Sequence, residues 1–409
     1  MNVLHVNYED LHGRRFNGYD LLSELASRGV VGKQAVLSKL SANPAVVSLC
    51  GEPGDAALQE ATIQAERGHS MDHLLYPWGR VLAGTPEFRN ADVVHYHLIH
   101  SHMLSLLDLP MLCAAKPSIW TFHDPWPMTG HCVHPGSCDG WLTGCSPCPS
   151  LDAFFPLQED RADRMYRVKQ RVFGEIDLDI VVASQFMRDM VRRSPLTRQF
   201  DRVHLIPFGI DTQAFLPDSE KTASRRALGI PDNHFVILVR ATDSEFKGLP
   251  YVLKALGSNP PSRPTTLLTV DQRGLMKDLA HDYNIVDLGW VEDATLYPRV
   301  FSAADVLLMP SIAESFGLMA LEGMAAGRPV ICFKGTAPES VTHAPESGIA
   351  VRMCDSRALR AALDALSANP EEARRRGHFG RTLAATEYSH EGYLDTMASL
   401  YRTVQTRVR

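Results

Sequence analysis

The chain has little basic charge, few cysteines and no long apolar run. Its 409 residues include 41 Lys and Arg against 47 Asp and Glu, so the formal net charge is −6. A nucleic-acid partner needs a basic face that neutralises phosphates, and we therefore expect none. Eight cysteines are too few for a disulfide scaffold of this size. The length suggests two or three globular domains.

No membrane-spanning segment is expected. The longest stretch of the N-terminal half without an ionised residue, Val93–Leu107, contains four histidines, which would be costly in hydrocarbon. Residues 1–10 have no basic region ahead of their apolar run, so we expect no signal peptide. These absences favour a cytoplasmic protein, and association with the cytoplasmic face of a membrane stays open.

Short apolar runs alternate with segments of helical period, in two successive blocks. The predicted strands are Val3–Asn7, Ala91–Tyr96, Ser118–Phe122, Ile180–Ala183, Val203–Ile206, Phe235–Val239, Thr266–Val270, Ile285–Leu288, Val306–Met309 and Pro329–Phe333. Helices are predicted at Asp20–Arg28, Ser184–Arg193 and Gly317–Ala326. Buried strands that alternate with helices form parallel sheets covered on both faces, which indicates an α/β fold of two doubly wound domains. The Pro- and Gly-containing stretch Ile206–Asp218 is a candidate hinge between them.

A candidate anion site follows the strand that ends at Met309. A helix is predicted to begin near Ser315 and to end at Gly327. Unpaired backbone N–H groups at a helix start attract anions, and the acidic side chains of Glu314 and Glu322 could accept hydrogen bonds from ligand hydroxyls. A surface helix with Glu near its positive end would explain the same residues without a ligand.

These residues also carry a resemblance. The frame E-S-F-G-L-x-x-L-E-G-M-A-x-G-x-P-V at residues 314–330 resembles the signature of the retaining nucleotide-sugar glycosyltransferases of family 4. Their architecture, GT-B, has two Rossmann-like domains facing across a cleft. The resemblance implies that Glu322 holds the donor ribose and that Glu314 contacts the donor sugar. It also implies that the diphosphate lies on the backbone amides of Ser315, Phe316, Gly317 and Leu318. Similarity extends over Val181–Met187, Ile206–Phe215, Ala303–Ser311 and the loop that contains Gly335, Pro338 and Glu339.

Two cations are candidates for binding the diphosphate. Arg240 ends an apolar strand, and Lys247-Gly248 follows in a polar loop. Both could be solvated surface charges, but the pair resembles the family's R-x-n-K-G arrangement, which implies stabilisation of the leaving phosphate. The sequence departs from the family after the next strand, where Val270 to Gly274 stand in place of an early Gly.

The N-terminal half offers a second set of site residues. The strand Ser118–Phe122 delivers His123 and Asp124, and a carboxylate beside a histidine can hold it in one tautomer. The T-x-H-D-x-W resemblance implies that this His lies at the reaction centre; a capped strand end is the alternative. We expect His97 and Trp126 to bind the acceptor. Gly18, in place of the family's Gly-Gly turn, could open the first helix and let the backbone approach the donor.

Four cysteines crowd into a Gly- and Pro-rich loop. Their positions are Cys132, Cys138, Cys145 and Cys148. Such a loop cannot order itself by burying apolar surface, and four thiolates match a structural zinc site. Two disulfides, which cytosolic redox conditions disfavour, or free thiols are the alternatives. The insert at 130–150 resembles one found in some bacterial surface-polysaccharide glycosyltransferases, and we expect it to shape the acceptor side.

Two further patterns have competing interpretations. Asp177 and Asp179 imitate a metal-binding D-x-D, but they stand at the start of an apolar strand, where we expect them to be merely solvated. The segment 161–173 combines basic and apolar residues and could either dock on anionic lipid or pack as an ordinary surface helix. The residues concerned are Arg161, Arg164, Met165, Arg167, Val168, Lys169, Arg171, Val172 and Phe173.

The sequence therefore predicts a retaining glycosyltransferase that uses a nucleoside diphosphate sugar and no catalytic cofactor. Residues 1–208 would bind a glycan, lipid-linked or small-molecule acceptor. Residues 209–389 would bind the donor. Residues 390–409 would form a helix that returns to the first domain. The expected catalytic residues are His123, Asp124, Arg240, Lys247 and Glu314. The product would be a polysaccharide, a glycolipid or a glycosylated metabolite. An epimerase or phosphorylase on the same fold, and a non-catalytic sugar-nucleotide-binding subunit, are the alternatives.

Overall fold

The chain divides into two compact units, which are described separately. The computed structural model describes residues 1–152, 154–215 and 218–407. Unit 1 contains Met1–Ala183, Met187–Pro207 and the chain from Tyr393 onward, and unit 2 contains Ser184–Phe186 and Phe208–Gly392. The predicted hinge Ile206–Asp218 includes residues 216–217, and the predicted last helix includes residues 408–409; both pairs lie outside the described residues.

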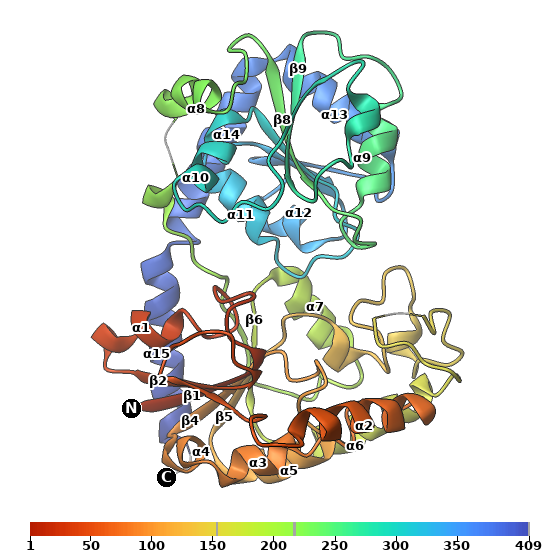
Figure 1. Ribbon diagram of the computed structural model, residues 1–409, viewed down its shortest axis with the longest axis vertical. Helices are drawn as coiled ribbons and strands as arrows, with labels where there is room; N and C mark the ends of the chain where they lie inside the picture. Colours follow the sequence, from red (N-terminus) through yellow and green to blue (C-terminus); the bar gives the residue numbers. More distant parts are fainter. Residues whose placement is uncertain (153, 216–217, 408–409) are drawn as a thin grey trace. The chain divides into compact units, whose positions relative to one another are not determined.

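Unit 1 is built on a seven-stranded parallel sheet in the order β3-β2-β1-β4-β5-β6-β7 (Figure 1). Its strands are β1 (Asn2–Glu9), β2 (Val31–Ser38), β3 (Val46–Ser48), β4 (Val93–Tyr96), β5 (Ser118–Thr121), β6 (Asp179–Val182) and β7 (Val203–Leu205). Its helices are α1 (Leu21–Glu24), α2 (Asp55–Gly68), α3 (Trp78–Gly84), α4 (Pro86–Asn90), α5 (Leu109–Ala115), α6 (Ala162–Gly174), and most of α7 (Gln185–Arg193) and α15 (His390–Thr406).

Alternating side chains of this sheet pack on helices at both faces. Val3, Val93, Ile119 and Val181 face one way and form a buried cluster with α1 and α15. On the other face, the Trp120 ring meets Phe173 of α6 edge-on, with ring centroids 6.0 Å apart. The strands are therefore buried on both faces, as continuous apolar runs in a parallel sheet require.

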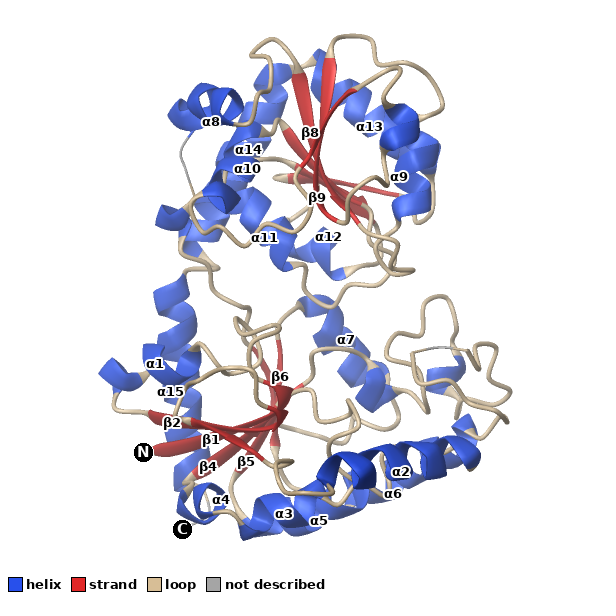
Figure 2. Ribbon diagram, in the orientation of Figure 1, coloured by secondary structure: helices blue, strands red, loops and turns tan. Residues whose placement is uncertain are grey.

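Unit 2 is built on a six-stranded parallel sheet in the order β10-β9-β8-β11-β12-β13 (Figure 2). The strands are β8 (Phe235–Ala241), β9 (Thr265–Asp271), β10 (Asn284–Asp287), β11 (Val306–Met309), β12 (Val330–Phe333) and β13 (Gly348–Val351). The helices are α8 (Lys221–Ala227), α9 (Leu249–Leu256), α10 (Leu296–Ala303), α11 (Leu318–Ala325), α12 (Ala337–Val341), α13 (Ser356–Ala368) and α14 (Pro370–Thr386). Helices α9 and α13 complete the core on one face, and α11 packs Gly323 against Leu307 on the other.

The order in which successive strands are added reverses once in each sheet. In unit 1 the strand order reverses between β1 and β4, and in unit 2 between β8 and β11. In open parallel sheets, ligands bind beyond the carboxyl ends of the strands at such switch points. The ten predicted strands are all present, and β2, β3 and β13 are additional. The predicted helix Asp20–Arg28 is instead split into α1 and a short 3₁₀ turn at Ala26–Arg28.

Candidate active site

Lys247 and Glu314 meet at the switch point of unit 2. Lys247 lies in the loop after β8, Glu314 in the loop after β11, and Nζ of the lysine lies 2.7 Å from Oε2 of the glutamate. The two loops pack closely: the Ile312 N–H donates to the Phe246 carbonyl at 2.9 Å. Gly248 has φ 72°, and a Cβ there would lie 2.0 Å from a carbonyl oxygen of Pro310, so only glycine fits.

Arg240 has a different partner from Lys247. It lies near the end of β8, and its Nε is 2.7 Å from Oδ2 of Asp271, which ends the neighbouring strand β9. Asp271 has φ 89°, a conformation that glycine adopts most easily. The position where the family often has glycine is therefore occupied by a carboxylate that holds Arg240. Sequence reasoning noted the missing glycine but did not anticipate this ion pair.

The helix after Glu314 begins later than predicted. Gly317, with φ 94°, precedes α11 as its N-cap, and of Ser315, Phe316, Gly317 and Leu318 only Leu318 is helical. Ala320 and Leu321 donate the first helical bonds to the Gly317 carbonyl. The N–H groups of Leu318 and Met319 precede those bonds and are the donors that a helix start offers to an anion. A glycine in the left-handed conformation stops the helical backbone from extending toward Ser315.

Two predicted donor residues of unit 2 are buried. Phe316 is 4% exposed, and its ring packs edge-on against Phe208 at 5.1 Å, so its side chain belongs to the core. Glu322, on α11, is 3% exposed and accepts a 2.8 Å hydrogen bond from the hydroxyl of Tyr297 on α10. Tyr297 was missed by sequence reasoning, because no local motif connects the two helices.

A chain of imidazoles lies at the switch point of unit 1. His5 stands on β1, His97 follows β4 and His123 follows β5. Nδ1 of His5 is 3.1 Å from Nε2 of His97, and Nδ1 of His97 is 3.1 Å from Nε2 of His123. Burial lowers the pKa of His5 and of His123 to about 3, and that of His97 well below its usual 6.5. All three rings are therefore neutral near pH 7.

The neutral chain has a preferred direction. Each ring carries one N–H, so the two hydrogen bonds run either toward His123 or toward His5. In the second case, an N–H would stand on Nε2 of His5, which is buried and has no hydrogen-bond partner in the described part of the chain. Orphaned buried N–H groups are rarer than unpaired acceptors. The favoured direction places the N–H of His123 on Nδ1.

Gly18 covers this chain of imidazoles. It has φ 92°, and a Cβ there would lie 2.3 Å from Nδ1 of His5 and 2.8 Å from Nε2 of His97. It does not open the first helix, which begins at Leu21. The predicted approach of its backbone to a donor stays a prediction.

Asp124 has two hydrogen-bond partners of its own, and its predicted influence on the His123 tautomer stays a prediction. Its Oδ2 lies 2.9 Å from Nε2 of His100, and its Oδ1 accepts the Trp126 N–H at 2.9 Å. Nε2 of its neighbour His123 lies 3.1 Å from Nδ1 of His97.

Trp126 and His97, the predicted acceptor residues, are each 2% exposed. The Trp126 ring stacks on His100 at a centroid distance of 4.6 Å, and the ammonium of Lys169 lies 3.5 Å from the ring centroid. The structure gives both side chains packing contacts, and their role in acceptor binding stays a prediction.

The four-cysteine insert lies beside a buried lysine, Lys169. All eight cysteines lie among the described residues, and none of them is disulfide-bonded there. Backbone N–H groups approach two of the sulfurs: Gly130 N–H to Cys145 at 3.1 Å and Gly140 N–H to Cys138 at 3.3 Å. Burial lowers the pKa of the adjacent Lys169 to about 7, partly opposed by Cys145 and Cys132. Among the described residues, no three cysteine sulfurs come within 4.8 Å of one another, as a tetrahedral zinc site requires. Zinc binding by this insert stays a prediction.

The basic segment 161–173 is the amphipathic helix α6, and its apolar side is buried. Met165, Val172 and Phe173 are each at most 3% exposed, and Lys169 is fully buried. The lysine donates to the carbonyls of Trp126 and Thr129 at 2.6 and 2.9 Å. Three of the four apolar residues expected to reach lipid are therefore in the core, and the fourth, Val168, is half-buried. Membrane contact through this helix stays a prediction. Within the described residues, no helix has the length and apolar character needed to cross a bilayer.

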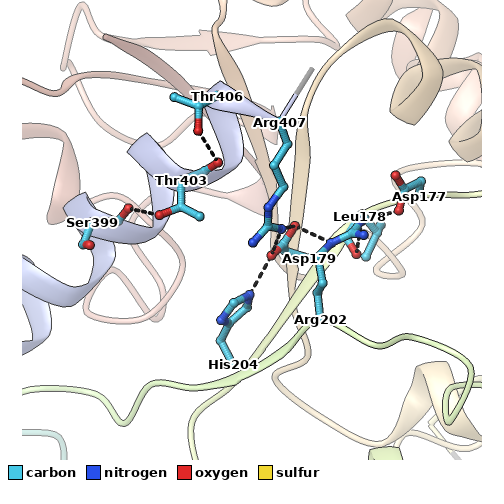
Figure 3. Close-up of polar contacts among 9 residues, drawn as sticks. All are labelled: Asp177, Leu178, Asp179, Arg202, His204, Ser399, Thr403, Thr406 and Arg407. Carbon is cyan, nitrogen blue, oxygen red and sulfur yellow. Dashed lines mark hydrogen bonds and ion pairs between the residues drawn. The ribbon is translucent and has the colours of Figure 1, made fainter. Parts of the chain in front are cut away.

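Asp177 and Asp179, which resemble a metal-binding D-x-D pair, hold neighbouring side chains in the fold (Figure 3). Asp179, whose side chain is 3% exposed, begins β6 and accepts from His204 at 2.6 Å, Arg202 at 3.0 Å and Arg407 at 2.7 Å. The expectation that it is solvated is wrong, because the end of α15 covers this edge of the sheet. Asp177 is 87% exposed and pairs with Arg202. Two arginines and a histidine already occupy the oxygens that a metal would need.

The fold matches solved glycosyltransferase structures over the whole chain. Sucrose-phosphate synthase from Thermosynechococcus elongatus aligns with a TM-score of 0.70 and 20% identity over 99% of both chains. Anabaena HepE in complex with UDP-glucose aligns with a TM-score of 0.67 and 14% identity over 98% of this chain and all of that one. Together with the two parallel sheets, this likeness defines an α/β protein of the GT-B fold.

Two family models match successive parts of the chain: Glycosyltransferase Family 4 over residues 38–214 and Glycosyl transferases group 1 over residues 220–382. The chain belongs to the family 4 glycosyltransferases. The putative colanic acid biosynthesis glycosyl transferase WcaC of Escherichia coli K12 is 27% identical over 266 residues, 61% of each chain. The D-inositol 3-phosphate glycosyltransferase of Paenarthrobacter aurescens is 32% identical over 209 residues, 48% of this chain and 50% of that one. The matched region thus spans 50 to 61% of these relatives' own length.

Proposed function

We propose that this chain is a retaining glycosyltransferase that moves a sugar from a nucleoside diphosphate sugar to an acceptor hydroxyl. The observation that carries the proposal is the meeting of Lys247 and Glu314, 2.7 Å apart, at the switch point of unit 2 and in the loop that leads to α11. Family membership supports the reaction class. The HepE complex with UDP-glucose makes a UDP-sugar the first donor to test.

The leaving diphosphate would lie at the start of α11. Lys247 and the N–H groups of Leu318 and Met319 would stabilise its charge, as preorganised donors do for a developing anion. Glu314 orients the lysine through their ion pair and would contact the donor sugar. Arg240 would contribute if the diphosphate replaces Asp271 as its partner. In front-side displacement, the acceptor oxygen bonds to the anomeric carbon on the face from which the phosphate oxygen departs, so the configuration of the sugar is retained. The departing phosphate oxygen takes the proton of the acceptor hydroxyl.

Unit 1 would carry the acceptor and supply a neutral hydrogen-bond donor. The favoured direction of the imidazole chain places an N–H on Nδ1 of His123, and a neutral imidazole can donate to a sugar or phosphate oxygen without bringing charge. Glu322, oriented by Tyr297, would bind the ribose hydroxyls.

The test is turnover of UDP-glucose and other nucleotide sugars by the purified chain, with a panel of glycan, lipid-linked and small-molecule acceptors. We expect nucleotide release that depends on an acceptor, and an α-linked product from an α-linked donor by NMR. An inverted product would contradict the retaining mechanism. Conversion of the donor without an acceptor would indicate an epimerase. Turnover that depends on inorganic phosphate would indicate a phosphorylase. Absence of turnover with every donor would indicate a binding subunit.

A further inference from the structure

A second group of polar side chains lies in unit 1, away from the imidazole chain. Asp72 and His73 follow the end of α2, and His102 stands in the loop after β4. In the described part of the chain, these three residues form one of two groups whose ligand atoms all lie within 4.8 Å of one another. The other group, His5, His95 and His97, uses its ring nitrogens in hydrogen bonds to Tyr401, to Thr121 and to one another. In the present group, Nδ1 of His102 lies 2.7 Å from the Tyr76 hydroxyl, which a bound ion would displace, and Nδ1 of His73 has no hydrogen-bond partner among the described residues.

The spacing of this group suits a small ion. Nδ1 of His73 lies 3.2 Å from Oδ2 of Asp72, and Nδ1 of His102 lies 3.9 Å from Oδ1 of the same carboxylate. Ligand bonds of about 2.1 Å around a tetrahedral ion separate neighbouring ligand atoms by about 3.4 Å. The two measured distances run to different oxygens of the carboxylate and lie on either side of that value, and one ligand atom from each of the three residues lies within 4.8 Å of the others.

His73 presents a lone pair to the carboxylate. Its Nε2 makes a hydrogen bond to the carbonyl oxygen of His100, and because a carbonyl only accepts, Nε2 carries the proton. Nδ1 is then an acceptor; it is buried and has no hydrogen-bond partner among the described residues. It faces Asp72, another acceptor, so a proton or a cation must lie between them. A backbone carbonyl that fixes the opposite ring nitrogen is the usual support of a metal-binding imidazole.

The surroundings add a second carboxylate and a small space. Glu66, 3% exposed, accepts backbone N–H bonds from His73, Leu74 and Leu75 at 2.6 to 2.7 Å. A cavity of about 30 Å³ is lined by Glu66, Asp72 and His102, among other residues that include Arg67 and Tyr76. That volume holds an ion with a bound water.

The backbone at this place is unusual. Ser70, His73 and His102 have φ of 49°, 65° and 57°, in the left-handed region that residues other than glycine rarely adopt. Such residues gather where a binding site needs a particular direction of side chains. Here the backbone turns two imidazoles toward one carboxylate.

We propose that Asp72, His73 and His102 bind one divalent transition-metal ion of the zinc class, with water from the cavity as fourth ligand. Two imidazoles and a carboxylate are a ligand set that zinc accepts, and an open fourth position is compatible with it. The ion ties the end of α2 to the loop that contains His100. His100 in turn donates to Asp124, next to His123.

The experiment must separate this site from the cysteine insert. The full chain with Cys132→Ser and Cys145→Ser is stripped with a chelator and titrated with Zn²⁺, and in parallel with Co²⁺, whose spectrum reports the ligand type. We expect one equivalent of either ion and a cobalt spectrum without thiolate charge transfer. His102→Gln or Asp72→Asn in this background should weaken Zn²⁺ binding at least tenfold. His69→Gln, an exposed imidazole at the end of α2, is the matched control and should leave affinity unchanged.

A second readout protects the test from a folding defect. Circular dichroism confirms the fold of each variant, and Zn²⁺ should raise the unfolding temperature of the cysteine variant but not of the same chain with His102→Gln. If Asp72→Asn does not fold, the His102→Gln variant tests the proposal alone, because His102 is partly exposed and its replacement should leave the fold intact. Absence of Zn²⁺ binding in the cysteine variant, or undiminished affinity after His102→Gln, overturns the proposal. Neither result affects the proposed transferase reaction, which is measured separately.

Discussion

Lys247 and Glu314 form an ion pair that contributes little to the stability of the fold but fixes the position of the lysine ammonium. Their side chains are 24% and 18% exposed. Partly exposed pairs of this kind contribute about 0–1 kcal/mol to folding. Their distance of 2.7 Å holds the ammonium in one place, which matters more for a developing phosphate charge than for stability.

Lys247→Ala should therefore slow turnover and leave the fold intact. Removal of one preorganised donor from a developing anion typically lowers kcat by about 10²- to 10³-fold. Initial rates of nucleotide release at saturating donor would measure the change, and thermal unfolding should move little. Lys254→Ala, an exposed lysine of α9, is the matched control. A rate for Lys247→Ala within threefold of the unchanged chain would remove this residue from the leaving-group site.

Glu322 offers a separate prediction on donor binding. Hydrogen bonds to a charged group are worth about 1.5–3 kcal/mol, so Glu322→Ala should weaken UDP binding by about 10- to 100-fold. Tyr297→Phe keeps the carboxylate and removes its 2.8 Å partner, and it should have a smaller effect. Calorimetric titration with UDP measures both variants, and unchanged affinity for Glu322→Ala would contradict the ribose role.

At the scale of elements, Gly18 packs the loop after β1 against His5 of β1 and His97 of the loop after β4. A methyl group there would meet His5 at 2.3 Å and would also require a side chain at φ 92°. Gly18→Ala should destabilise unit 1 by about 1–3 kcal/mol from the backbone conformation alone, with the steric clash added. Gly29→Ala, at φ 75° with nothing within 4 Å, isolates the backbone contribution. Urea unfolding should show Gly18→Ala as the more destabilised of the two, and equal effects would contradict close packing over the histidines.

The end of α15 is attached to β6 through Asp179 (Figure 3). Arg407 contacts both carboxylate oxygens at 2.7 Å, and Arg202 and His204 complete the group. Removing one partner of a buried charge pair leaves the others uncompensated, so Asp179→Asn should cost about 3 kcal/mol. Asp177→Asn, on a residue 87% exposed, is the matched control and should cost less than about 0.5 kcal/mol. Similar melting of both variants would show that this attachment contributes little.

At the scale of the whole molecule, buried histidines connect stability to pH. Burial lowers the pKa of His5 and His123 to about 3, against 6.5 for an exposed histidine. Below pH 6.5 the histidines of the unfolded chain bind protons that the native state does not bind. The stability that the neutral buried histidines contribute is therefore complete above pH 6.5 and is lost as the pH falls toward 3. For each unit by which the pH falls in that window, one such histidine lowers the free energy of unfolding by about 1.4 kcal/mol.

Asp179 acts in the same direction at lower pH. Burial would raise its pKa, but hydrogen bonds from His204 and Arg407 outweigh burial and lower it. Its stabilising effect is present above the ordinary aspartate pKa of about 3.8 and is lost below it.

Unit 1 should therefore unfold more easily at pH 5 than at pH 7. Four of the five tryptophans, Trp78, Trp120, Trp126 and Trp141, lie in unit 1, so tryptophan fluorescence during urea unfolding reports mainly on that unit. His5→Gln should reduce the pH dependence by about 1.4 kcal/mol per pH unit, and the exposed His69→Gln should leave it unchanged. An unfolding midpoint independent of pH between 5 and 7 would contradict neutral buried histidines.

Much of the fold could be predicted because strands and turns are local. The ten predicted strands are present since each is a short apolar run bounded by turn residues. Strand β2 was missed because Lys33 and Gln34 interrupt its apolar run, and β13, Gly348–Val351, because it is short and begins with glycine. The start of α11 was misplaced by three residues because a glycine with positive φ can precede a helix as well as follow one.

The site was predicted less completely, for a physical reason. The sequence by itself determined the α/β class, the loops that carry Lys247, Glu314 and Glu322, and the family signature around them, because these depend on neighbouring residues. The tertiary structure decided which side chains meet: Lys247 with Glu314 across 67 positions, His5 with His97 across 92, and Asp179 with Arg407 across 228. Contacts between distant residues depend on strand order and on which face each side chain takes, and no local pattern encodes them.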